Sequence, residues 1–559
     1  MKHRARLINY FSRHDRGWVL GLCALVGAIY LPFLGSQFFF DDLSFFSTDT
    51  VEVYKSNSFD FGLRWLPYAS LGRLYAIFSS EFSYIYRLCN MLLHAANAVL
   101  LFYFLRNLVA AVQAYEIEPA RAVRGAWFGA SVFALHPVAA FAVGYVIQIS
   151  VLMSTLFSLL MLLAYLHGLL SGERRWFALA VLAYFLACFS KEHSVLMPAV
   201  LWAMGLLLSS GKRVDRHVLW LTWLALIAIA LFVTLRAHGV LGSPYEPMAK
   251  QLFAQQGIEE STPVLHLLSA LTQAGLFFKY LLLWILPDPT LMSIDMRETF
   301  LAAATSWQAW LGGIAFMLYG MFGIRLLLRG GTSGLFGFAM LYPWLLFWVE
   351  MAGIRMQEPF VLYRSYLWMP GMALFIPIVL AKLPEQRGRL IMVCLLLLFI
   401  PLSWARLWIF SDSYRLWNEA AILLKDEQVA GADRIYFNRG QAEMAEKKWE
   451  AAAADFKRAS DISPELEPIH YLLGAAYGNA GRFAEALTQF DTAISLQPDD
   501  SQVYFSKGMT LKLLHRDEES MLQMEQSCKL NNKVACLILK VQHRGRNSMG
   551  ENQGDGSTN

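Results

Sequence analysis

Long apolar runs constrain the fold of this chain more than any other feature. About twelve runs of roughly membrane-spanning length, ~17 to 25 residues, precede residue 410. They cover residues 17–34, 86–105, 126–143, 149–170, 176–190, 194–210, 217–237, 264–287, 307–328, 334–352, 366–382 and 389–408. Hydrophobic residues make up 56% of the chain and charged residues 16%, against roughly 25% charged in soluble domains. We therefore expect an all-α, polytopic domain whose partner is the lipid bilayer.

Charges in the short loops predict how the chain is threaded, because Lys and Arg collect on the cytoplasmic side. Cation-rich segments are the N-terminus, 106–124, 174–175, 212–216, 325–329 and 382–389. Three apolar runs separate 212–216 from 325–329, an odd number, so one of them cannot cross. We choose 264–287, which carries Lys279 and ends in LPDP, as a re-entrant or interfacial helix. This predicts about 11 crossings of a cell inner membrane, with an uncleaved N-terminal anchor.

The composition changes near Arg406, where apolar runs give way to amphipathic soluble helices. We place a membrane domain at 1–410, a soluble helical domain at 411–542 and a polar, disordered tail at 543–559. The loop charges put the soluble domain outside the cytoplasm, in the periplasm. The net charge of +4 is small and lacks a long basic block, so no nucleic-acid partner is expected.

The soluble domain repeats with a period of 34 residues, in copies 433–466, 467–500 and 501–534. The middle copy has the spacing of a tetratricopeptide repeat, carried by Gly474, Tyr477, Gly481, Ala486, Phe490, Ala493 and Pro498. Small residues permit close helix crossing, and the proline stops the second helix. This predicts an α-solenoid that is either a scaffold without a ligand or a groove for a peptide or protein partner.

Two cysteines near the end of the solenoid leave their redox state open. Cys528 and Cys536 lie eight residues apart, with LNNK between them as a turn. In an oxidising compartment, two facing helices could bring them within disulfide range. The alternative is a pair of unpaired core thiols.

The candidate chemistry begins in the first outer loop, GSQFFFDDLSFFSTD, where Asp41 and Asp42 follow an aromatic run. Burial at the membrane surface can raise the pKa of a carboxylate and fit it for general base work. The alternative for the pair is a solvated N-cap of the next helix.

Ionisable or polar residues at the outer rim of spans are costly and often functional. The set expected to bind substrate is His136, Gln148, Lys191, Glu192 and Arg364. His136 could instead be a satisfied packing histidine, and Lys191 and Glu192 could pair with each other. A cation at the depth of Lys191 also suits a lipid phosphate.

A series of motifs carries a family resemblance. FFFDDLSFF, RLCNMLLHAANAVLLFYFLR, FALHPVAAFAVGYVIQ, LACFSKEHSVLMPAVLW, LLWILPDPTLMSID and VLYRSYLWMPGM follow in this order and precede the repeats. In this combination, over about residues 20–540, the chain resembles the transmembrane-and-tetratricopeptide-repeat proteins. It looks like a bacterial member of those GT-C glycosyltransferases, similar in its membrane half to protein O-mannosyltransferases.

The resemblance implies transfer of a sugar from a polyprenyl phosphate carrier to a hydroxyl acceptor, protein Ser or Thr, outside the cytoplasm. Asp41 would be the catalytic base and Asp42 would support it, while the repeats would recruit the acceptor protein. No cofactor is implied, because a lipid phosphate is already a good leaving group. A divalent cation that bridges Asp42 and the phosphate remains an alternative.

The chain departs from its relatives at two motifs. Ile149 stands where bacterial relatives commonly have a basic residue, and Leu362 and Tyr363 replace an acid and a histidine before Arg364. Phosphate binding therefore rests on Lys191 and Arg364, and the donor sugar need not be mannose. The competing hypothesis is a non-catalytic, membrane-anchored repeat scaffold for envelope or pilus assembly.

Overall fold

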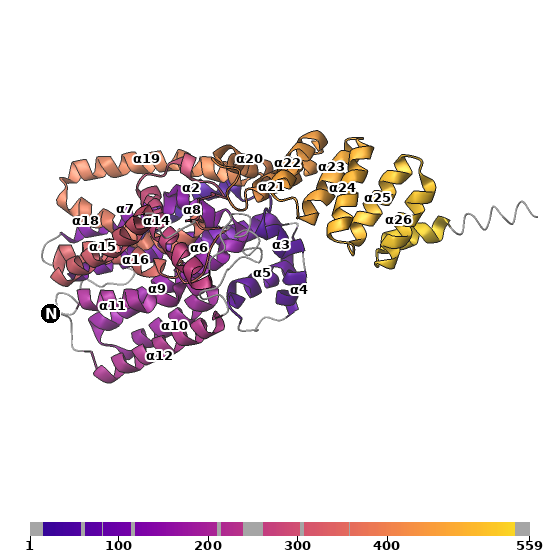
Figure 1. Cartoon of the computed structure of the whole chain (residues 1–559). Helices are drawn as coiled ribbons and strands as arrows, with labels where there is room; N and C mark the ends of the chain where they lie inside the picture. Colours follow the sequence, from indigo (N-terminus) through magenta and orange to yellow (C-terminus); the bar gives the residue numbers. More distant parts are fainter. Residues whose placement is uncertain are drawn as a thin grey trace, which may run out of the picture. The chain divides into compact units, whose positions relative to one another are not determined.

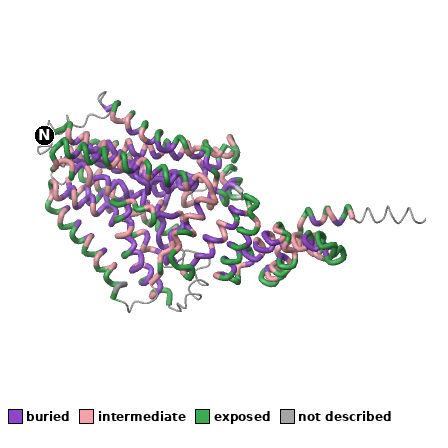
Figure 2. The backbone as a smooth tube through the Cα atoms, turned by 90° about the horizontal axis from the view of Figure 1, so that it is seen from above, coloured by how far each residue is buried: buried purple, intermediate pink, exposed green. Residues whose placement is uncertain are grey.

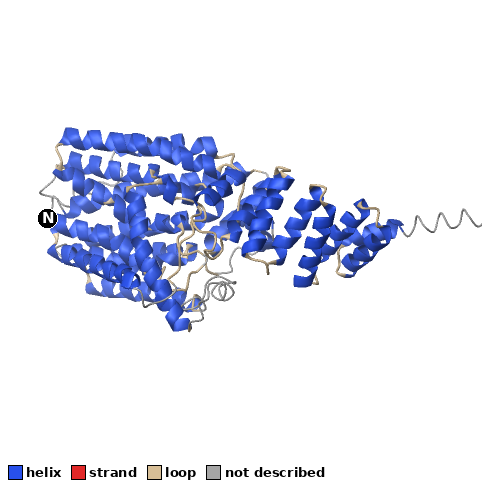
Figure 3. Cartoon of the chain, turned by 45° about the horizontal axis from the view of Figure 1, so that its top comes forward, coloured by secondary structure: helices blue, strands red, loops and turns tan. Residues whose placement is uncertain are grey.

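The structure is a computed structural model of the 559-residue chain. It describes residues 15–47, 49–56, 62–80, 82–112, 118–208, 214–238, 261–301, 307–356 and 358–542. Within these ranges every regular element is a helix (Figure 3). The chain divides into two compact units between Leu416 and Trp417, close to the expected boundary at 410. The predicted tail 543–559 lies outside the described residues.

The first unit, called the membrane unit below, contains many helices and short 3-10 turns (Figure 1). They are α2 (Arg16–Tyr30), η2 (Leu31–Phe33), α3 (Asp41–Ser47), α4 (Asp49–Ser56), α5 (Trp65–Phe78), α6 (Ser83–Val112), α7 (Pro119–Leu135), α8 (Pro137–Val143), η3 (Val146–Gln148), α9 (Ile149–Ser171), α10 (Arg174–Ser190), η4 (Glu192–Leu196), α11 (Met197–Leu207), α12 (Arg216–Arg236), α14 (Thr262–Ile285), η5 (Pro289–Leu291), α15 (Trp307–Arg329), α16 (Gly331–Phe347), η6 (Leu362–Leu367), α17 (Met369–Ala373), α18 (Phe375–Lys382) and α19 (Glu385–Phe410). The unit boundary falls within α20 (Ser413–Leu423).

Seven of the described helices are long and apolar enough to cross a membrane. An eighth joins them if α7 and α8, which meet at a bend of 60°, form one span. The all-helical, apolar character predicted for this unit is confirmed. The expected eleven crossings exceed these helices, and shorter apolar helices stand at Glu192–Leu207, Gly331–Phe347 and Met369–Lys382.

Burial separates inner helices from peripheral ones. The most apolar stretch of α9 is 72% buried and that of α6 is 56% buried, against 17% in α12 and 22% in α15. Figure 2 shows the same division, with exposed positions along peripheral helices and buried positions inside. Because the exposed side chains of α12 and α15 are apolar, these helices suit contact with lipid, whereas α6 and α9 form the core.

Helix α14 corresponds to the run expected not to cross. It is one unbroken helix of 24 residues, long enough to span, and it is therefore not a re-entrant hairpin. Several of its polar contacts, however, are made to one later stretch of the chain, between Met351 and Ser365. His266 lies 2.8 Å from the carbonyl of Met351, the Gln273 amide donates to Pro359, and the Trp284 indole donates to Ser365.

The second unit, called the repeat unit below, is a series of helix pairs. They are α21 (Asp433–Ala445) with α22 (Trp449–Ile462), α23 (Glu467–Asn479) with α24 (Phe483–Leu496), and α25 (Ser501–Leu513) with α26 (Asp517–Lys529); a further helix covers 533–542. The first helices of the pairs begin at 433, 467 and 501, where the sequence period places the starts of the three copies. The predicted solenoid is confirmed.

The repeat glycines explain why this spacing is required. A Cβ atom added to Gly474 would lie 2.7 Å from a ring carbon of Phe490, and one added to Gly440 would lie 2.9 Å from Phe456. Both aromatic rings are buried between the two helices of their own pair. Because no side chain fits between helix and ring, only glycine permits this close crossing.

The last repeat carries a disulfide. Cys528, late in α26, is bonded to Cys536 in the helix 533–542, and their Cα atoms are 4.8 Å apart. Of the two alternatives that the sequence left open, the structure contains the bond. It ties the terminal helix to the last repeat.

Candidate active site

Two adjacent carboxylates at the start of α3 differ in exposure. Phe40, in the left-handed region with a φ of 52°, turns the chain into the helix. Asp41 is exposed, whereas Asp42 is completely buried. The backbone N–H of Asp41 donates a hydrogen bond of 2.9 Å to the hydroxyl of Tyr145. Asp41 is therefore the accessible member of the pair, held at its backbone by a distant tyrosine.

Asp42 is tied to the same distant segment. Its carboxylate accepts N–H groups from Ile147 at 2.8 Å and from Val146 at 3.4 Å. Burial raises the pKa of Asp42 to about 7, although Arg87 and the two N–H groups act in the opposite direction. Both acids lie in the first turn of α3, as the capping alternative expects. Asp42, however, is not solvated, and it holds α3 against the turn that precedes α9.

The turn between α8 and α9, residues 144–148, joins the two halves of the site. It places Tyr145 beside Asp41, and its last residue, Gln148, accepts a hydrogen bond of 3.3 Å from the Lys191 ammonium. Burial and the two neighbouring carboxylates hold the pKa of Tyr145 well above its usual value, so its side chain stays a neutral hydroxyl. The rings of Tyr145 and Tyr363 are 6.1 Å apart.

Lys191 is a buried lysine whose direct partners, the amide of Gln148 and the ring of Tyr363, are neutral. Its residue is 5% exposed, and its Nζ atom lies 5.1 Å from the centroid of the Tyr363 ring. Within the described ranges, Lys191 hydrogen-bonds to Gln148 and forms no ion pair. Burial, together with nearby Arg64, holds its pKa well below the ordinary value. A buried cation in this state attracts an anionic ligand.

The expected pairing of Lys191 with Glu192 is replaced by another partner. Arg64, just before α5, donates hydrogen bonds from two nitrogen atoms to the Glu192 carboxylate, one of them 2.9 Å long. Glu192 lies 3.4 Å from His193, and His193 lies 3.1 Å from Glu350 on its other side. The segment that leads into α5 is thereby bonded to the segment that carries Lys191.

Arg364 is brought to the same group, but its charge is already balanced. It lies 3.4 Å from both Glu350 and Glu358, and Arg355 lies 3.2 Å from Glu350. The prediction that Arg364 shares phosphate binding is therefore weaker than for Lys191, because an anion would have to compete with two carboxylates. Lys191 and Arg364 therefore differ in charge compensation, although the sequence analysis assigned phosphate binding to both.

His136 has a different position. Its Nδ1 accepts the N–H of Val138 at 3.2 Å and caps α8, and its Nε2 lies 3.1 Å from the carbonyl of Trp284. The ring packs at 5.1 Å from Phe399. Both nitrogens are engaged at the 60° bend between α7 and α8, which fits the packing alternative for this histidine.

Several residues of the site were missing from the sequence hypotheses. Arg64, Tyr145, Arg87, Asn90 and Glu350 all contribute contacts to it. Many of their partners lie far along the chain, for example 128 residues away for the Arg64 contact with Glu192. The one available signal was the spacing of Arg87 and Asn90, which share a face of α6 in an apolar helix.

The surroundings of Asp42 bear on the alternative of a bridging divalent cation. Both of its carboxylate oxygens accept backbone N–H groups, and the positive Arg87 lies near it, which disfavours a second cation there. Across the described ranges, there is no group of three or more His, Cys, Asp or Glu side chains suited to a metal ion. The alternative in which a cation bridges Asp42 and a phosphate stays a prediction, because a carboxylate oxygen can accept more than one contact.

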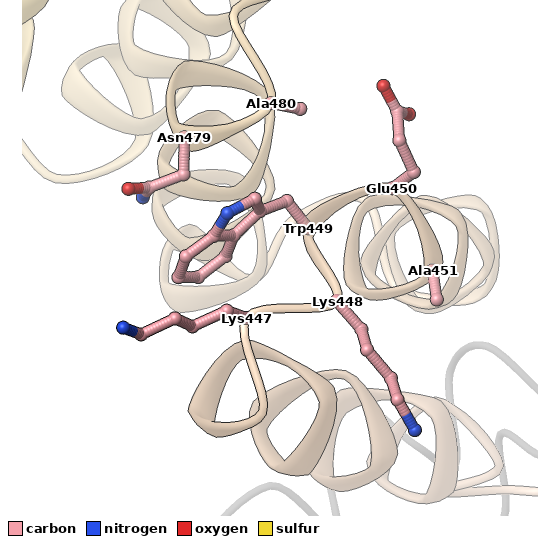
Figure 4. A pocket seen from close by; sticks show the side chains of 7 residues that line it. All are labelled: Lys447, Lys448, Trp449, Glu450, Ala451, Asn479 and Ala480. Carbon is pink, nitrogen blue, oxygen red and sulfur yellow. The ribbon is translucent and has the colours of Figure 1, made fainter.

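A second candidate surface is a pocket in the repeat unit. It has a volume of about 520 Å³ and is lined by Lys447, Lys448, Trp449, Glu450, Ala451, Asn479 and Ala480. In Figure 4, Lys447 and Trp449 extend to the same side, while Lys448 and Glu450 point away. Lys448 and Glu450 each pair with a neighbouring opposite charge. The pocket thus offers an indole ring and the Lys447 ammonium to a partner.

Comparisons with known proteins concern repeats. The tetratricopeptide repeat family matches residues 443–505. Tetratricopeptide repeat protein 16 of Macaca fascicularis is 29% identical over 125 residues, which is 20% of this chain and 14% of that protein. The chain therefore covers only a small part of the curated relative that it matches.

Two solved structures are similar over a comparable share of the chain. The crystal structure of MamA has 20% identity and a TM-score of 0.20, over 22% of this chain and 68% of that one. YrrB, titled a TPR protein with an unusual peptide-binding site, has 14% identity and a TM-score of 0.22, over 28% of this chain and 82% of that one. The family match and the structure together show an all-helical protein with a C-terminal tetratricopeptide-repeat region, in which the described residues include seven or eight long apolar helices.

Proposed function

We propose that the membrane unit is a GT-C type glycosyltransferase, which moves a sugar from a polyprenyl phosphate carrier to a hydroxyl group outside the cytoplasm. The observation that carries the proposal is one site with an accessible carboxylate, Asp41, and a buried lysine, Lys191, that forms no ion pair with the residues that the structure describes. Tyr145 contacts Asp41, Tyr363 contacts Lys191, and the two rings are neighbours. A base and an anion site at this proximity suit transfer from a phosphate leaving group.

The reaction is a single displacement. Asp41 takes the proton of the acceptor hydroxyl while the oxygen of that hydroxyl forms a bond to the anomeric carbon of the sugar. The bond from that carbon to the phosphate oxygen breaks, and the phosphate leaves with the electron pair. Lys191 stabilises the charge of the phosphate. Asp42 does not act as the base, because both of its oxygens accept backbone N–H groups; it positions α3.

Charge balance supports Lys191 as the phosphate ligand. Arg64, Arg355 and Arg364 each have a carboxylate partner within 3.4 Å. Lys191 has a neutral amide and a ring. An anion at Lys191 would compensate its charge and raise its pKa, so binding should be accompanied by proton uptake. A lipid-borne phosphate suits a unit with peripheral apolar helices better than a free one.

Contacts between loops support the proposed topology. Three ion pairs join segments that were predicted to be cytoplasmic: Asp15 with Arg106 at 2.7 Å, Arg124 with Glu385 at 3.0 Å, and Arg174 with Asp215 at 3.1 Å. The proposed eleven crossings follow if the long apolar helices other than α14 cross, together with the bent pair, α10 and the three shorter apolar helices. In this count α14 lies at the membrane interface and does not cross.

The proposed orientation places the repeat unit in the periplasm, beside a cell inner membrane. The disulfide between Cys528 and Cys536 supports an oxidising compartment. In this arrangement the repeats recruit the acceptor protein, whose Ser or Thr hydroxyl receives the sugar. The indole of Trp449 and the ammonium of Lys447 are candidate contacts for it.

The test is a comparison of envelope glycopeptides by mass spectrometry. Cells that lack the protein are complemented with wild type, with Asp41→Asn, or with Asp461→Asn, which alters an exposed carboxylate of the repeat unit. We expect Asp41→Asn to reduce the glycosylated product at least ~10²-fold at equal protein levels, because a positioned base contributes roughly 10²- to 10⁴-fold. Asp461→Asn should match wild type. Full product from Asp41→Asn would refute the assignment.

A second candidate function is a non-catalytic, membrane-anchored scaffold for envelope or pilus assembly. The match of the repeat family to residues 443–505 favours it, since repeats of this kind present binding surfaces. The scaffold hypothesis predicts that Asp41→Asn and Lys191→Met leave assembly unchanged, while truncation after Phe410 abolishes it. The glycosyltransferase hypothesis predicts loss of product in all three variants.

A further inference from the structure

Helix α6 carries a stripe of buried polar side chains. Arg87, Asn90, His94 and Asn97 recur at spacings of three or four residues and therefore share one face. Each is at most 4% exposed. Polar groups are costly at this depth unless they satisfy other buried groups. We therefore ask which buried groups these four side chains contact.

Asn90 bonds to backbone that has left its helix. Its Nδ2 group lies 3.3 Å from the carbonyl of Val143, 3.2 Å from that of Tyr145 and 3.4 Å from that of Val146. The carbonyls of Tyr145 and Val146 also accept the backbone N–H groups of Gln148 and Ile149. The carbonyl of Val143, at the end of α8, differs, because the N–H of Ile147 that would continue the helix bonds to Asp42 instead. A buried carbonyl in an apolar unit needs another donor, and Asn90 supplies it from a helix more than 50 residues earlier in the chain.

The segment that Asn90 contacts is bonded both to the two carboxylates of α3 and to Lys191. Tyr145 accepts the N–H of Asp41, the N–H groups of Val146 and Ile147 bond to Asp42, and Gln148 bonds to Lys191. The side chain of Asn90 thus holds the turn 144–148, and this turn contacts both Asp41 and Lys191.

We propose that Asn90 is a positioning residue, which sets the distance between Asp41 and Lys191 by anchoring the turn 144–148. Its effect on transfer rests on the proposed function; its effect on the turn does not. Without the Asn90 amide, the Val143 carbonyl loses its side-chain donor and the turn loses its hydrogen bonds to α6. The turn then no longer holds Asp41, Asp42 and Lys191 at fixed positions.

Asn97 provides a matched control on the same helix. It too is fully buried, and its Nδ2 donates to the carbonyl of Leu152 at 3.0 Å and to the Tyr366 hydroxyl at 3.2 Å. Asn90→Ala and Asn97→Ala therefore remove the same chemical group from similar depth. Only the first removes a contact with the turn 144–148.

The first measurement is hydrogen–deuterium exchange of the full-length protein in lipid nanodiscs. In Asn90→Ala, the amides of Val146 and Ile147 should exchange roughly tenfold faster than in wild type, because local opening exposes them. In Asn97→Ala, their exchange should be unchanged. Equal exchange in Asn90→Ala and wild type, or the same acceleration in Asn97→Ala, would overturn the proposal.

The second measurement uses polyprenyl phosphate binding to the same nanodiscs, with envelope glycopeptides as the product assay. Asn90→Ala should weaken both, whereas Asn97→Ala should weaken neither. If Asn90→Ala does not fold, Tyr145→Phe tests the same link: it should lower product formation, leave phosphate binding unchanged, and refute the link if product is unchanged. Faster exchange in Asn90→Ala with neither binding nor product in wild type would refute the proposed function and leave the positioning role intact.

Discussion

The membrane unit and the repeat unit differ in how far apart in the sequence the partners of their buried polar contacts lie. In the repeat unit, Arg439 grips Asp455 at 2.5 and 2.7 Å across 16 residues, within one helix pair. In the membrane unit, Asp42 bonds to Ile147 across 105 residues and His94 contacts Tyr366 across 272. The buried ion pair of the first repeat thus forms inside one module, whereas the buried polar contacts of the membrane unit join segments that are far apart in the sequence.

The comparison predicts the largest stability effect for the local pair. Arg439→Met leaves two buried carboxyl groups, Asp455 and Glu443, without their cation, which should destabilise the first repeat by about 3 kcal/mol. Hydrogen exchange should accelerate in α21 and α22, and the membrane unit should be unaffected. Arg516→Met, which removes a solvent-exposed pair, is the control. Accelerated exchange throughout α6 and α9 would contradict the local character of the pair.

The disulfide is a second local contact, with an intermediate expected effect. Replacing both Cys528 and Cys536 by Ser should destabilise the helix 533–542 by roughly 2 kcal/mol, because the bond closes a short loop. Exchange should rise in that helix and remain unchanged in α21. Thiol labelling of the denatured, unreduced full-length protein from the membrane fraction, with the labelled cysteines identified by peptide mapping, provides the check on compartment. Labelling of both cysteines without reductant would contradict the bond and remove one support for the outside placement.

The smallest expected effect is a pH dependence of the first repeat. Burial and neighbouring Asp455 raise the pKa of Glu443 to about 7, above the ordinary value of 4.5. The folded state therefore holds a proton that the unfolded state has lost between these values. Stability should fall by about 1 to 2 kcal/mol as the pH rises from about 4.5 to 7, and then level off.

Glu443→Gln sharpens this test, because an amide keeps the size of the side chain and does not titrate. Exchange protection of α21, corrected for intrinsic rates, should become independent of pH in this variant. A protection that increases with pH in the wild-type protein would contradict the assignment of the raised pKa.

This difference in contact distance also explains which features were predictable from the sequence. The repeat boundaries at 433, 467 and 501 follow from the 34-residue period of the sequence. Gly474 is required by the close crossing within its own helix pair, which is a local contact. The apolar runs identify helices but do not reveal where they break. The bend at His136 and the turn 144–148 are stabilised by Trp284 and by Asn90, which no local pattern connects to them.

The candidate site was predictable in part for the same reason. Asp41, Gln148 and Lys191 were expected at the outer rim, and the structure brings them into one group. The roles of Lys191 and Arg364 could not be separated, because charge compensation depends on partners elsewhere in the chain. Glu350 balances Arg364, and it lies outside the motifs from which the site was inferred.

The central claim is that Lys191 binds the phosphate of a lipid carrier, and Lys279 offers a matched control. Both ammonium groups lie near an aromatic ring, Tyr363 at 5.1 Å and Phe360 at 4.5 Å, but Lys279 is paired with Glu298. The measurement is native mass spectrometry of the full chain in nanodiscs, titrated with polyprenyl phosphate and, separately, with polyprenol that lacks the phosphate. We predict that Lys191→Met weakens polyprenyl phosphate binding at least roughly tenfold, that Lys279→Met does not, and that polyprenol binding is the same in all three proteins. Unchanged polyprenyl phosphate affinity in Lys191→Met would contradict the account.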